Sequence, residues 1–288
     1  PGSTYKPFMA LAALASGSRD PDDSINDPGY FMLGSHKFRD SKPEGHGVVN
    51  LHKSIVISSD TYYYKLALNM GVDLIHEYIS PFGFGKNTGI DLKGEIAGIL
   101  PSSQWKEKKL GKPWLQGETP SIGIGQGYHT FTIMQMAKAV SIIANRGKVV
   151  TPRLIKASQD QQTGNFNFVK SKFEEDLKID PEWFEFVIDA MVEVNKVGTG
   201  ARVMANTSYD IAGKTGTSQV FTIKQDEEYD VETVPERLRD HSLYIGFAPA
   251  KNPKVALAII VENGGFGAKS AGPIARKIFD FILLNDNQ

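Results

Sequence analysis

A serine and a lysine near the start of the chain have the spacing of a nucleophile and its base. Ser3 and Lys6 are three residues apart, so on a helix they share one face. A serine hydroxyl becomes a good nucleophile when a base takes its proton, and a neighbouring lysine can be that base. The pattern alone is unspecific, because Ser103 and Lys106 repeat it. A simple helix N-cap is the alternative role for Ser3.

A second polar group interrupts an apolar stretch. Leu51 to Met70 have apolar positions at helical spacing, broken by Ser58-Ser59-Asp60. A polar triplet between two core-like helices indicates a turn that presents side chains to a site. The Ser-x-Asp spacing recurs at Ser18 and Asp20, so only the apolar flanks distinguish this copy.

A lysine on a predicted strand could bind a substrate. Ile211 to Thr217 predict a strand, whose side chains alternate between faces, so Lys214 and Gly216 share one face while Thr215 and Thr217 share the other. Glycine leaves the strand bare for the approach of another backbone. An ammonium beside a bare strand suits an extended peptide that ends in a carboxylate. The alternative is an ordinary edge strand with a solvated lysine.

Three potential metal ligands lie between residues 18 and 48. Asp27, Asp40 and His46 could together hold a metal ion, but a structural zinc site normally closes with four ligands. Solvated loop residues are the alternative interpretation of all three.

The composition excludes several classes of function. The net charge of the 288 residues is −1, which gives no support for nucleic acid as a partner. There is no cysteine, so disulfides, thiol catalysis and cysteine-based zinc sites are excluded. No apolar run is long enough to span a bilayer. Because the chain starts at Pro1, directly on the helix that carries Ser3, we expect it to be a fragment.

Periodicity and turn residues predict the elements that position these motifs. Helices are predicted over Ser3 to Ser16, Thr132 to Asn145, Asp180 to near Gly198, and Ile274 to Leu284. Further strands are predicted over Val149 to Ser158, Asn165 to Val169, Ser242 to Ala248, and Val255 to Val261. Irregular structure is predicted for residues 18–48, a long surface connection for 81–120, and a mobile charged loop for 222–240.

The three motifs, in this order, resemble those of penicillin-binding proteins and serine β-lactamases. The resemblance extends over nearly the whole chain to the transpeptidase domain of class B penicillin-binding proteins, most closely the branch of the elongation machinery. It is carried by the stretches Pro1-Gly2-Ser3-Thr4-x-Lys6-Pro7, Ser58-Ser59-Asp60-Thr61-Tyr62, Gly123-Ile124-Gly125-Gln126-Gly127, Ala144-Asn145-x-Gly147 and Ile211-Ala212-Gly213-Lys214-Thr215-Gly216-Thr217.

The resemblance implies an α+β fold, with a central antiparallel sheet flanked by helices and a mostly helical subdomain. It implies that residues 1–288 are one transpeptidase domain fragment, without the N-terminal part of that domain, the pedestal and the membrane anchor. It also implies a place at the periplasmic face of the bacterial inner membrane, with membrane proteins of the elongation machinery as partners and no nucleic acid.

The resemblance further implies a peptidoglycan D,D-transpeptidase. Ser3 would attack the carbonyl between the last two D-alanines of a stem peptide, and Lys6, kept neutral by the positive charge of Lys214, would take its proton. Ser58 would relay a proton to the leaving D-alanine, and the backbone N–H groups of Ser3 and Thr217 would form the oxyanion hole. The substrate-binding residues would be Asp60, Lys214, Thr215, Gly216 and Thr217. An amine from a neighbouring stem would complete the cross-link, and β-lactams would acylate Ser3.

Two departures from the family pattern concern the second motif. Many relatives have asparagine where this chain has Asp60, and an acid there could pair with Lys6. In some relatives, positions resembling Asp27, Asp40 and His46 bind zinc together with a cysteine, but that place is Ser59 here, a poorer ligand. No cofactor is therefore expected to be required. A serine β-lactamase and a non-catalytic β-lactam sensor domain remain as alternatives.

Overall fold

The computed structural model describes residues 1–220 and 234–285, and its centre is an antiparallel sheet. Strands β7 (Ala212–Ser218), β8 (His241–Ala248) and β9 (Val255–Val261) pair in the order β7-β8-β9. Lys214 lies opposite Ile245 of β8 in this register. All three strands were predicted, and within the described residues β7 pairs on one side only. The strand that carries Lys214 is therefore an edge strand.

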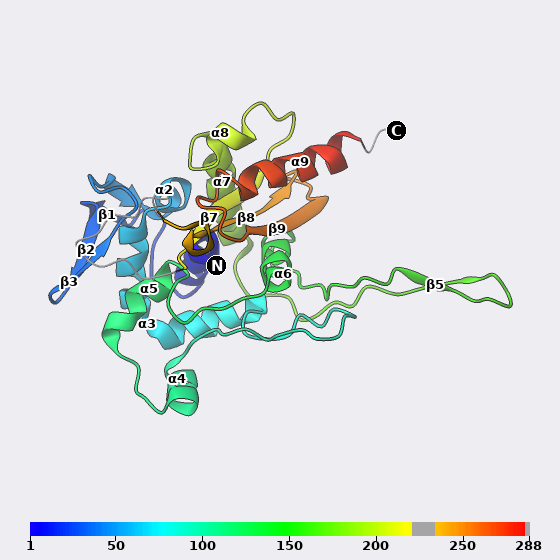
Figure 1. Cartoon of the computed structure of the whole chain (residues 1–288), viewed down its shortest axis with the longest axis horizontal. Coiled ribbons are helices and arrows are strands. Elements are labelled where there is room, and N and C mark those ends of the chain that lie inside the picture. The colour runs from blue at the N-terminus through cyan, green and yellow to red at the C-terminus, as the bar shows by residue number, and fades with distance from the viewer. Residues whose placement is uncertain (221–233, 286–288) are drawn as a thin grey trace.

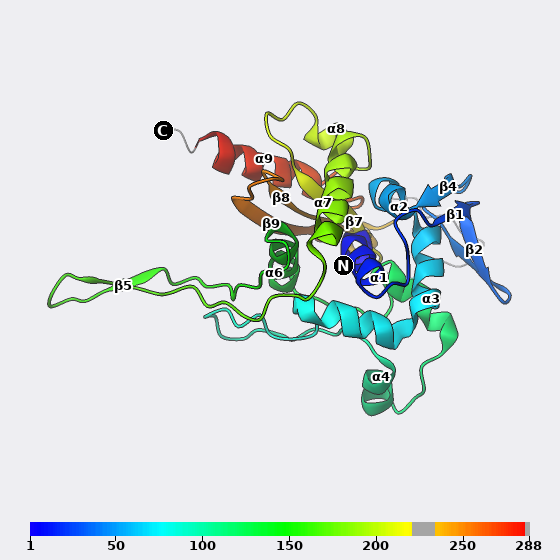
Figure 2. The ribbon, with the colours of Figure 1, turned by 180° about the vertical axis from the view of Figure 1, so that it is seen from behind.

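Helices cover both faces of the sheet (Figures 1 and 2). One face packs against α1 (Lys6–Ala15), α6 (Ile133–Ala144) and α7 (Pro181–Lys196), and the other against α8 (Ala201–Met204) and α9 (Ala271–Leu284). Every residue of α1 up to Leu14 is buried, as expected of a helix that is apolar on all sides. The short 3₁₀ helix η1 (Gly2–Tyr5) leads into α1. The helix that follows Ser3 therefore lies inside the core.

A mostly helical part lies beside the sheet. It contains α2 (Leu51–Ile57), α3 (Asp60–Ile79), α4 (Ser103–Leu110) and α5 (Thr119–Gly123), with short 3₁₀ helices η2 (Ser80–Phe82) and η3 (Gln116–Glu118). The predicted break at Ser58-Ser59-Asp60 separates α2 from α3. This arrangement confirms the α+β fold with a helical subdomain.

Two predictions for the connecting segments are wrong. Residues 18–48 are not irregular but form two antiparallel pairs, β1 (Ser24–Asp27) with β4 (Gly47–Asn50) and β2 (Tyr30–Leu33) with β3 (His36–Arg39). Each strand has four residues, too few for an alternating pattern to stand out between turn residues. The segment 81–120 is not only a surface connection, because it contains α4. Ser102 caps this helix by accepting a hydrogen bond from the Trp105 N–H.

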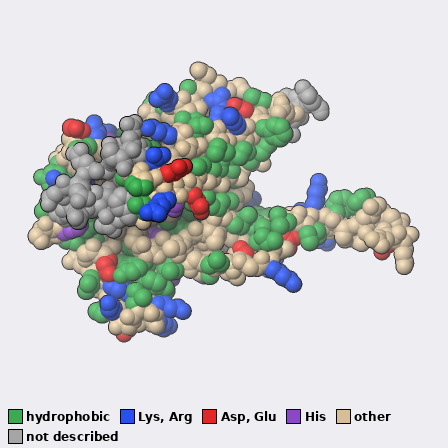
Figure 3. Space-filling view, in the orientation of Figure 1, with side chains coloured by type: hydrophobic (Ala, Val, Ile, Leu, Met, Phe, Trp, Pro, Cys, Tyr) green, Lys and Arg blue, Asp and Glu red, His purple; other side chains and the backbone are tan. Residues whose placement is uncertain are grey.

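The segment that connects α6 to α7 in the sequence forms a long two-stranded arm, which projects from the body (Figure 1). Its regular pairing is limited to β5 (Ala157–Gln159) and β6 (Phe166–Phe168), so the predicted strand over Val149 to Ser158 is far shorter than expected. The arm carries exposed aromatic side chains, including Phe166 and Phe168, which are 60% and 68% exposed. Apolar side chains are visible along it in Figure 3.

No described helix combines the length and apolar character that a membrane span requires. The predicted loop at 222–240 falls mostly outside the described residues. Its described end contains the short 3₁₀ helix η4 (Glu236–Leu238).

Candidate active site

Ser3 lies in a 3₁₀ turn that is packed between two other backbone segments. The N–H of Gly2 donates to the carbonyl oxygen of Gly125 at 3.0 Å. Gly2 has a φ of 54°, and a Cβ there would overlap the carbonyl oxygen of Thr217. Only glycine fits this conformation and this close approach. The turn therefore holds half-buried Ser3 beside the end of β7.

Lys6, one helical turn after Ser3, connects the first motif to the second. Its side chain is fully buried, and its Nζ donates to the Ser58 carbonyl oxygen at 2.7 Å and the Ser58 Oγ at 3.1 Å. Nζ also pairs with Asp60 Oδ1 at 2.6 Å, and it lies 5.4 Å from the centre of the Tyr63 ring. The predicted pairing of Asp60 with Lys6 is present.

The second motif sits in a tight turn between α2 and α3. Ser58 ends α2 in the left-handed conformation, with φ 62° and ψ 39°. Ser59 then caps α3 by accepting a hydrogen bond from the Tyr62 N–H at 3.2 Å. The left-handed residue reverses the chain, so Ser58 and Asp60 both reach Lys6. Burial raises the pKa of Asp60, although the charge of Lys6 acts in the opposite direction.

The third motif lies on β7, next to η1, which leads into α1. Gly216, on the same face of β7, is so close to η1 that a Cβ would contact Thr4. Lys214 is fully buried, and its Nζ donates to the Thr215 carbonyl oxygen at 3.2 Å. Burial, with repulsion from Lys6 in addition, lowers the pKa of Lys214 well below its ordinary value. The three motifs therefore meet at one place, between η1, the α2–α3 turn and β7.

The two threonines of the third motif lie on the opposite face of β7 from Lys214. The Thr215 hydroxyl shares a hydrogen bond of 2.6 Å with the Thr199 hydroxyl, which follows α7. Thr217 Oγ1 accepts from the Gly267 N–H at 3.4 Å. The strand alternation expected from the sequence is thus present in the structure.

Residues 1–280 match the transpeptidase family described as "Penicillin binding protein transpeptidase domain". The chain belongs to this family. Among curated relatives of the transpeptidase domain, peptidoglycan D,D-transpeptidase MrdA of Haemophilus influenzae is 41% identical and MrdA of Escherichia coli K12 is 42% identical. The matches cover 98% and 100% of this chain but only 44% and 46% of those relatives. The chain thus spans less than half of their length.

Solved structures of the family have the same fold. Pseudomonas aeruginosa PBP2 in complex with WCK 5153 gives a TM-score of 0.86 at 38% identity, over 99% of this chain and 61% of that one. Helicobacter pylori PBP2 in a complex with MreC also gives 0.86, at 29% identity, over 100% of this chain and 50% of the other. The resemblance expected from the motifs is confirmed.

The three predicted metal ligands of this transpeptidase domain come together. One ligand atom each of Asp27, Asp40 and His46 lies within 4.8 Å of the others. The fourth position belongs to Ser59, whose hydroxyl donates to Asp27 Oδ2 at 2.6 Å, while the Thr61 N–H donates to Asp40 Oδ2 at 2.8 Å. A closed zinc site requires a fourth strong ligand, so these residues do not fit one. The hydrogen bonds of the two aspartates tie the strands around β1 to the start of α3, while the buried Nε2 of His46 has no hydrogen-bond partner among the described residues.

Sequence reasoning missed several residues that shape the site of the transpeptidase domain. Gln126 donates through Nε2 to the Thr217 carbonyl oxygen at 3.2 Å, and Thr199 binds Thr215. Asn195 donates through Nδ2 to the Ile211 carbonyl oxygen at 2.8 Å and holds the start of β7. Gly125 and Gln126 lie in a glycine-dense stretch visible in the sequence, but nothing there indicates which backbone they contact.

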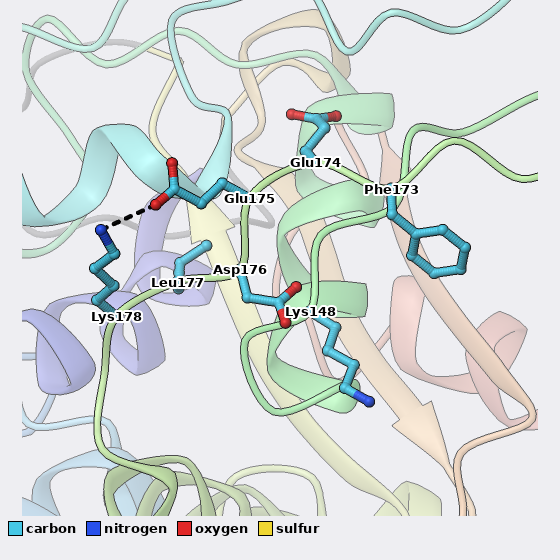
Figure 4. Close-up of a pocket in the computed structure, with 7 residues that line it drawn as sticks. All are labelled: Lys148, Phe173, Glu174, Glu175, Asp176, Leu177 and Lys178. Carbon is cyan, nitrogen blue, oxygen red and sulfur yellow. Dashed lines mark ion pairs between the residues drawn. The ribbon is translucent and has the colours of Figure 1, made fainter.

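Hollows elsewhere on the transpeptidase domain do not contain the candidate residues. Figure 4 shows one at the base of the arm, lined by residues that include Lys148 and Phe173, where Lys178 pairs with Glu175 at 2.9 Å. A second, of about 880 Å³, lies between the β2–β3 hairpin and residues 116–128. Neither is lined by Ser3, Lys6, Ser58 or Lys214.

Proposed function

We propose that this chain is the catalytic domain of a peptidoglycan D,D-transpeptidase, which cross-links stem peptides through an acyl-enzyme at Ser3. The observation that carries the proposal is the contact of Lys6 Nζ with both Ser58 and Asp60, one helical turn from Ser3 and beside β7. A proton-accepting amine and a relaying hydroxyl are thereby in contact, and the proposed nucleophile precedes that amine by one helical turn. The curated names of the relatives favour this activity over a β-lactamase or a sensor domain.

The donor peptide would lie along the free edge of β7. Its terminal carboxylate would be held by the hydroxyls of Thr215 and Thr217, with the charge of Lys214 acting from the other face of the strand, where Gly216 packs against Thr4. In the first step the Ser3 oxygen bonds to the penultimate D-alanine carbonyl, the Ser3 proton passes to Lys6, and the N–H groups of Ser3 and Thr217 bind the oxyanion. The peptide bond then breaks, and Ser58 delivers a proton to the leaving D-alanine. An acceptor amine later displaces Ser3.

The test is covalent labelling by benzylpenicillin, measured by intact-protein and peptide mass spectrometry. One adduct on Ser3 is expected, and Ser3→Ala should abolish it. The second Ser-x-x-Lys pair provides a matched control, because Ser103 donates to Asp73 and Lys106 pairs with Glu118. Ser103→Ala should label normally. An adduct elsewhere would contradict the proposal.

Two further measurements separate the alternatives. Rapid release of the penicilloyl group would identify a β-lactamase, whereas a transpeptidase retains it. Restored wall growth by a whole protein carrying Ser3→Ala would identify a sensor.

The partners and location follow the same relatives. We infer that the whole protein acts at the periplasmic face of the inner membrane with other elongation proteins, supported by the Helicobacter pylori complex of PBP2 with MreC. Co-purification of the whole protein with its own MreC counterpart from membranes would test this, and consistent failure to recover the pair would count against it.

A further inference from the structure

Two buried lysines and one carboxylate share the candidate site, and their protonation is not set by the motifs alone. Lys6 and Lys214 are both fully buried, and Asp60 is 17% exposed. Lys214 is close enough to be affected electrostatically by both Lys6 and Asp60. Asp40 is a further charge that acts on Lys6 and Asp60. Two buried ammonium groups beside one carboxylate would repel each other.

The hydrogen bonds show which lysine can carry the charge. An ammonium group has three N–H donors and no acceptor, and leaving buried donors unpaired is costly. Lys6 has three acceptors: the Ser58 carbonyl oxygen, the Ser58 hydroxyl and the Asp60 carboxylate. Among the described residues Lys214 has one, the Thr215 carbonyl oxygen. The geometry suits an ammonium at Lys6 and a neutral amine at Lys214.

This assignment reverses the one expected from the family resemblance, in which Lys214 is charged and Lys6 is neutral. The reason is Asp60, because an asparagine there would offer Lys6 no negative charge. The depressed pKa of Lys214 agrees with the hydrogen-bond geometry. With Lys6 charged, Ser3 has no base.

We propose that Asp60 makes the arriving donor carboxylate the trigger that converts Lys6 into a base. This proposal rests on the proposed transpeptidase function. In the free site the proton is on Lys6. The negative charge of a bound donor carboxylate beside Lys214 favours transfer of that proton from Lys6 to Lys214. The Lys6 ammonium loses one proton and the Lys214 amine gains one, with Ser58 Oγ, 3.1 Å from Lys6 Nζ, as the first step of the path. Lys6 then has a lone pair for the Ser3 proton. Asp60 is thus a positioning residue that acts through Lys6.

The proposal predicts that a ligand without a carboxylate loses reaction rate as well as affinity. The probes are benzylpenicillin and its methyl ester, with acylation of Ser3 followed by mass spectrometry over a range of concentrations and pH. For the unaltered domain, the ester should lower the maximal acylation rate by about 10²-fold or more, the range attributed to general-base catalysis.

Asp60→Asn separates this mechanism from simple binding. In this variant Lys6 is no longer held as an ammonium, so the ester should mainly raise the half-saturating concentration and lower the maximal rate less than tenfold. The proposal is overturned if the ester raises only the half-saturating concentration of the unaltered domain and leaves its maximal rate unchanged. It is also overturned if the ester lowers the maximal rate of the unaltered domain and of Asp60→Asn by the same factor. If benzylpenicillin itself fails to acylate Ser3, the proposed function fails instead.

A direct measurement keeps the proposal testable if Asp60→Asn does not fold. In a Ser3→Ala domain with ¹³Cε-labelled lysine, nuclear magnetic resonance reports the protonation of each side chain, and Lys214→Arg in the same background assigns its signal. Lys214 should be neutral in the free domain and charged when benzylpenicillin is bound. A charged Lys214 in the free domain at neutral pH would contradict the proposal.

Discussion

Lys6 is the residue through which the first two motifs contact each other, since its ammonium bonds to Ser58 and Asp60 together. Ser3 shares its helix, but Ser58 and Asp60 come from a turn more than fifty residues later. The side chains of Ser58 and Asp60 are therefore positioned by a single buried amine. A variant without the Lys6 amine can show whether Lys6 is needed for acylation, for stability of the fold, or for both.

We expect Lys6→Ala to abolish labelling by penicillin while the fold survives, because the lost group is the proton acceptor and water can reach partly exposed Asp60. Labelling by mass spectrometry and thermal unfolding would measure both effects. Lys138→Ala is the matched control, since Lys138 is also buried and ion-paired, to Glu174 at 2.6 Å, away from the candidate site. The control should unfold at a lower temperature yet label normally. Normal labelling of Lys6→Ala would exclude Lys6 as the base.

Lys214 should lower the free energy of unfolding of the domain, because its amine is fully buried. Its pKa is lowered in the folded state by burial, so between the folded and the ordinary value the unfolded chain binds more protons. The free energy of unfolding therefore increases as pH rises from the folded-state pKa of Lys214 to its ordinary pKa. Lys214→Met should stabilise the domain at neutral or lower pH, by roughly the 1–4 kcal/mol seen when buried charged pairs are replaced by apolar residues, with the gain shrinking towards alkaline pH. Chemical denaturation at several pH values measures this, and a gain independent of pH would refute the titration argument.

At the scale of elements, the α2–α3 turn is held from outside by the strands around β1. The Ser59 hydroxyl and the Thr61 N–H bind Asp27 and Asp40, so the second motif is fixed by side chains 32 and 21 residues earlier in the chain. We expect these hydrogen bonds to take the place of the metal that a cysteine at the position of Ser59 would favour.

The purified domain should accordingly contain well below one equivalent of zinc, and Ser59→Cys should bind one. A thiolate completes a four-ligand set with Asp27, Asp40 and His46, and binding should raise the unfolding temperature because the site forms only in the folded chain. Elemental analysis and thermal unfolding with and without a chelator would measure this. Ser59→Ala is the zinc-free comparison. A full equivalent in the unaltered domain would show that our rejection of a zinc site is wrong.

The elements that sequence predicts well are those whose signal is local. The helix at Pro181–Lys196 has an Asp180 cap and a proline at its start, and β8 and β9 are strongly apolar. The β1–β4 pair escapes prediction because its partners are four-residue strands separated by another hairpin. The same limit applies to the site. The motif residues are visible in order and the Lys6–Asp60 pairing was expected from the family resemblance, but the Gln126 contact with Thr217 depends on folding.

At the scale of the whole molecule, the body contains the site and the arm lies apart from it. The base of the arm is fixed, because Asp91 accepts hydrogen bonds from the N–H groups of Leu154 and Ile155. The tip has only the short β5–β6 pair and exposes Phe166 and Phe168. The tip therefore adds little to the core.

Replacing residues 157–168 by Asn-Gly should leave penicillin labelling unchanged. Lys156 and Val169 already share a backbone hydrogen bond of 3.0 Å, and Asn-Gly closes a two-residue hairpin at such a pair. The unfolding temperature should change by no more than about 2–4 °C, corresponding to roughly 1 kcal/mol in a domain of this size. Light scattering should show less self-association, because two exposed aromatics are gone. Loss of labelling would show that the tip supports the site.

The glycines around Ser3 restrict how such a protein can escape an antibiotic. A Cβ at Gly2 would strike Thr217, one at Gly125 would strike Gly2 and Tyr5, and one at Gly216 would strike Thr4. Under the proposed function, these tightly packed backbone segments position Ser3 for the natural donor and for a β-lactam alike. Resistance by a new side chain at these three positions would carry a folding defect. Mutational routes to resistance should therefore begin farther out, where a drug is bulkier than the peptide it imitates.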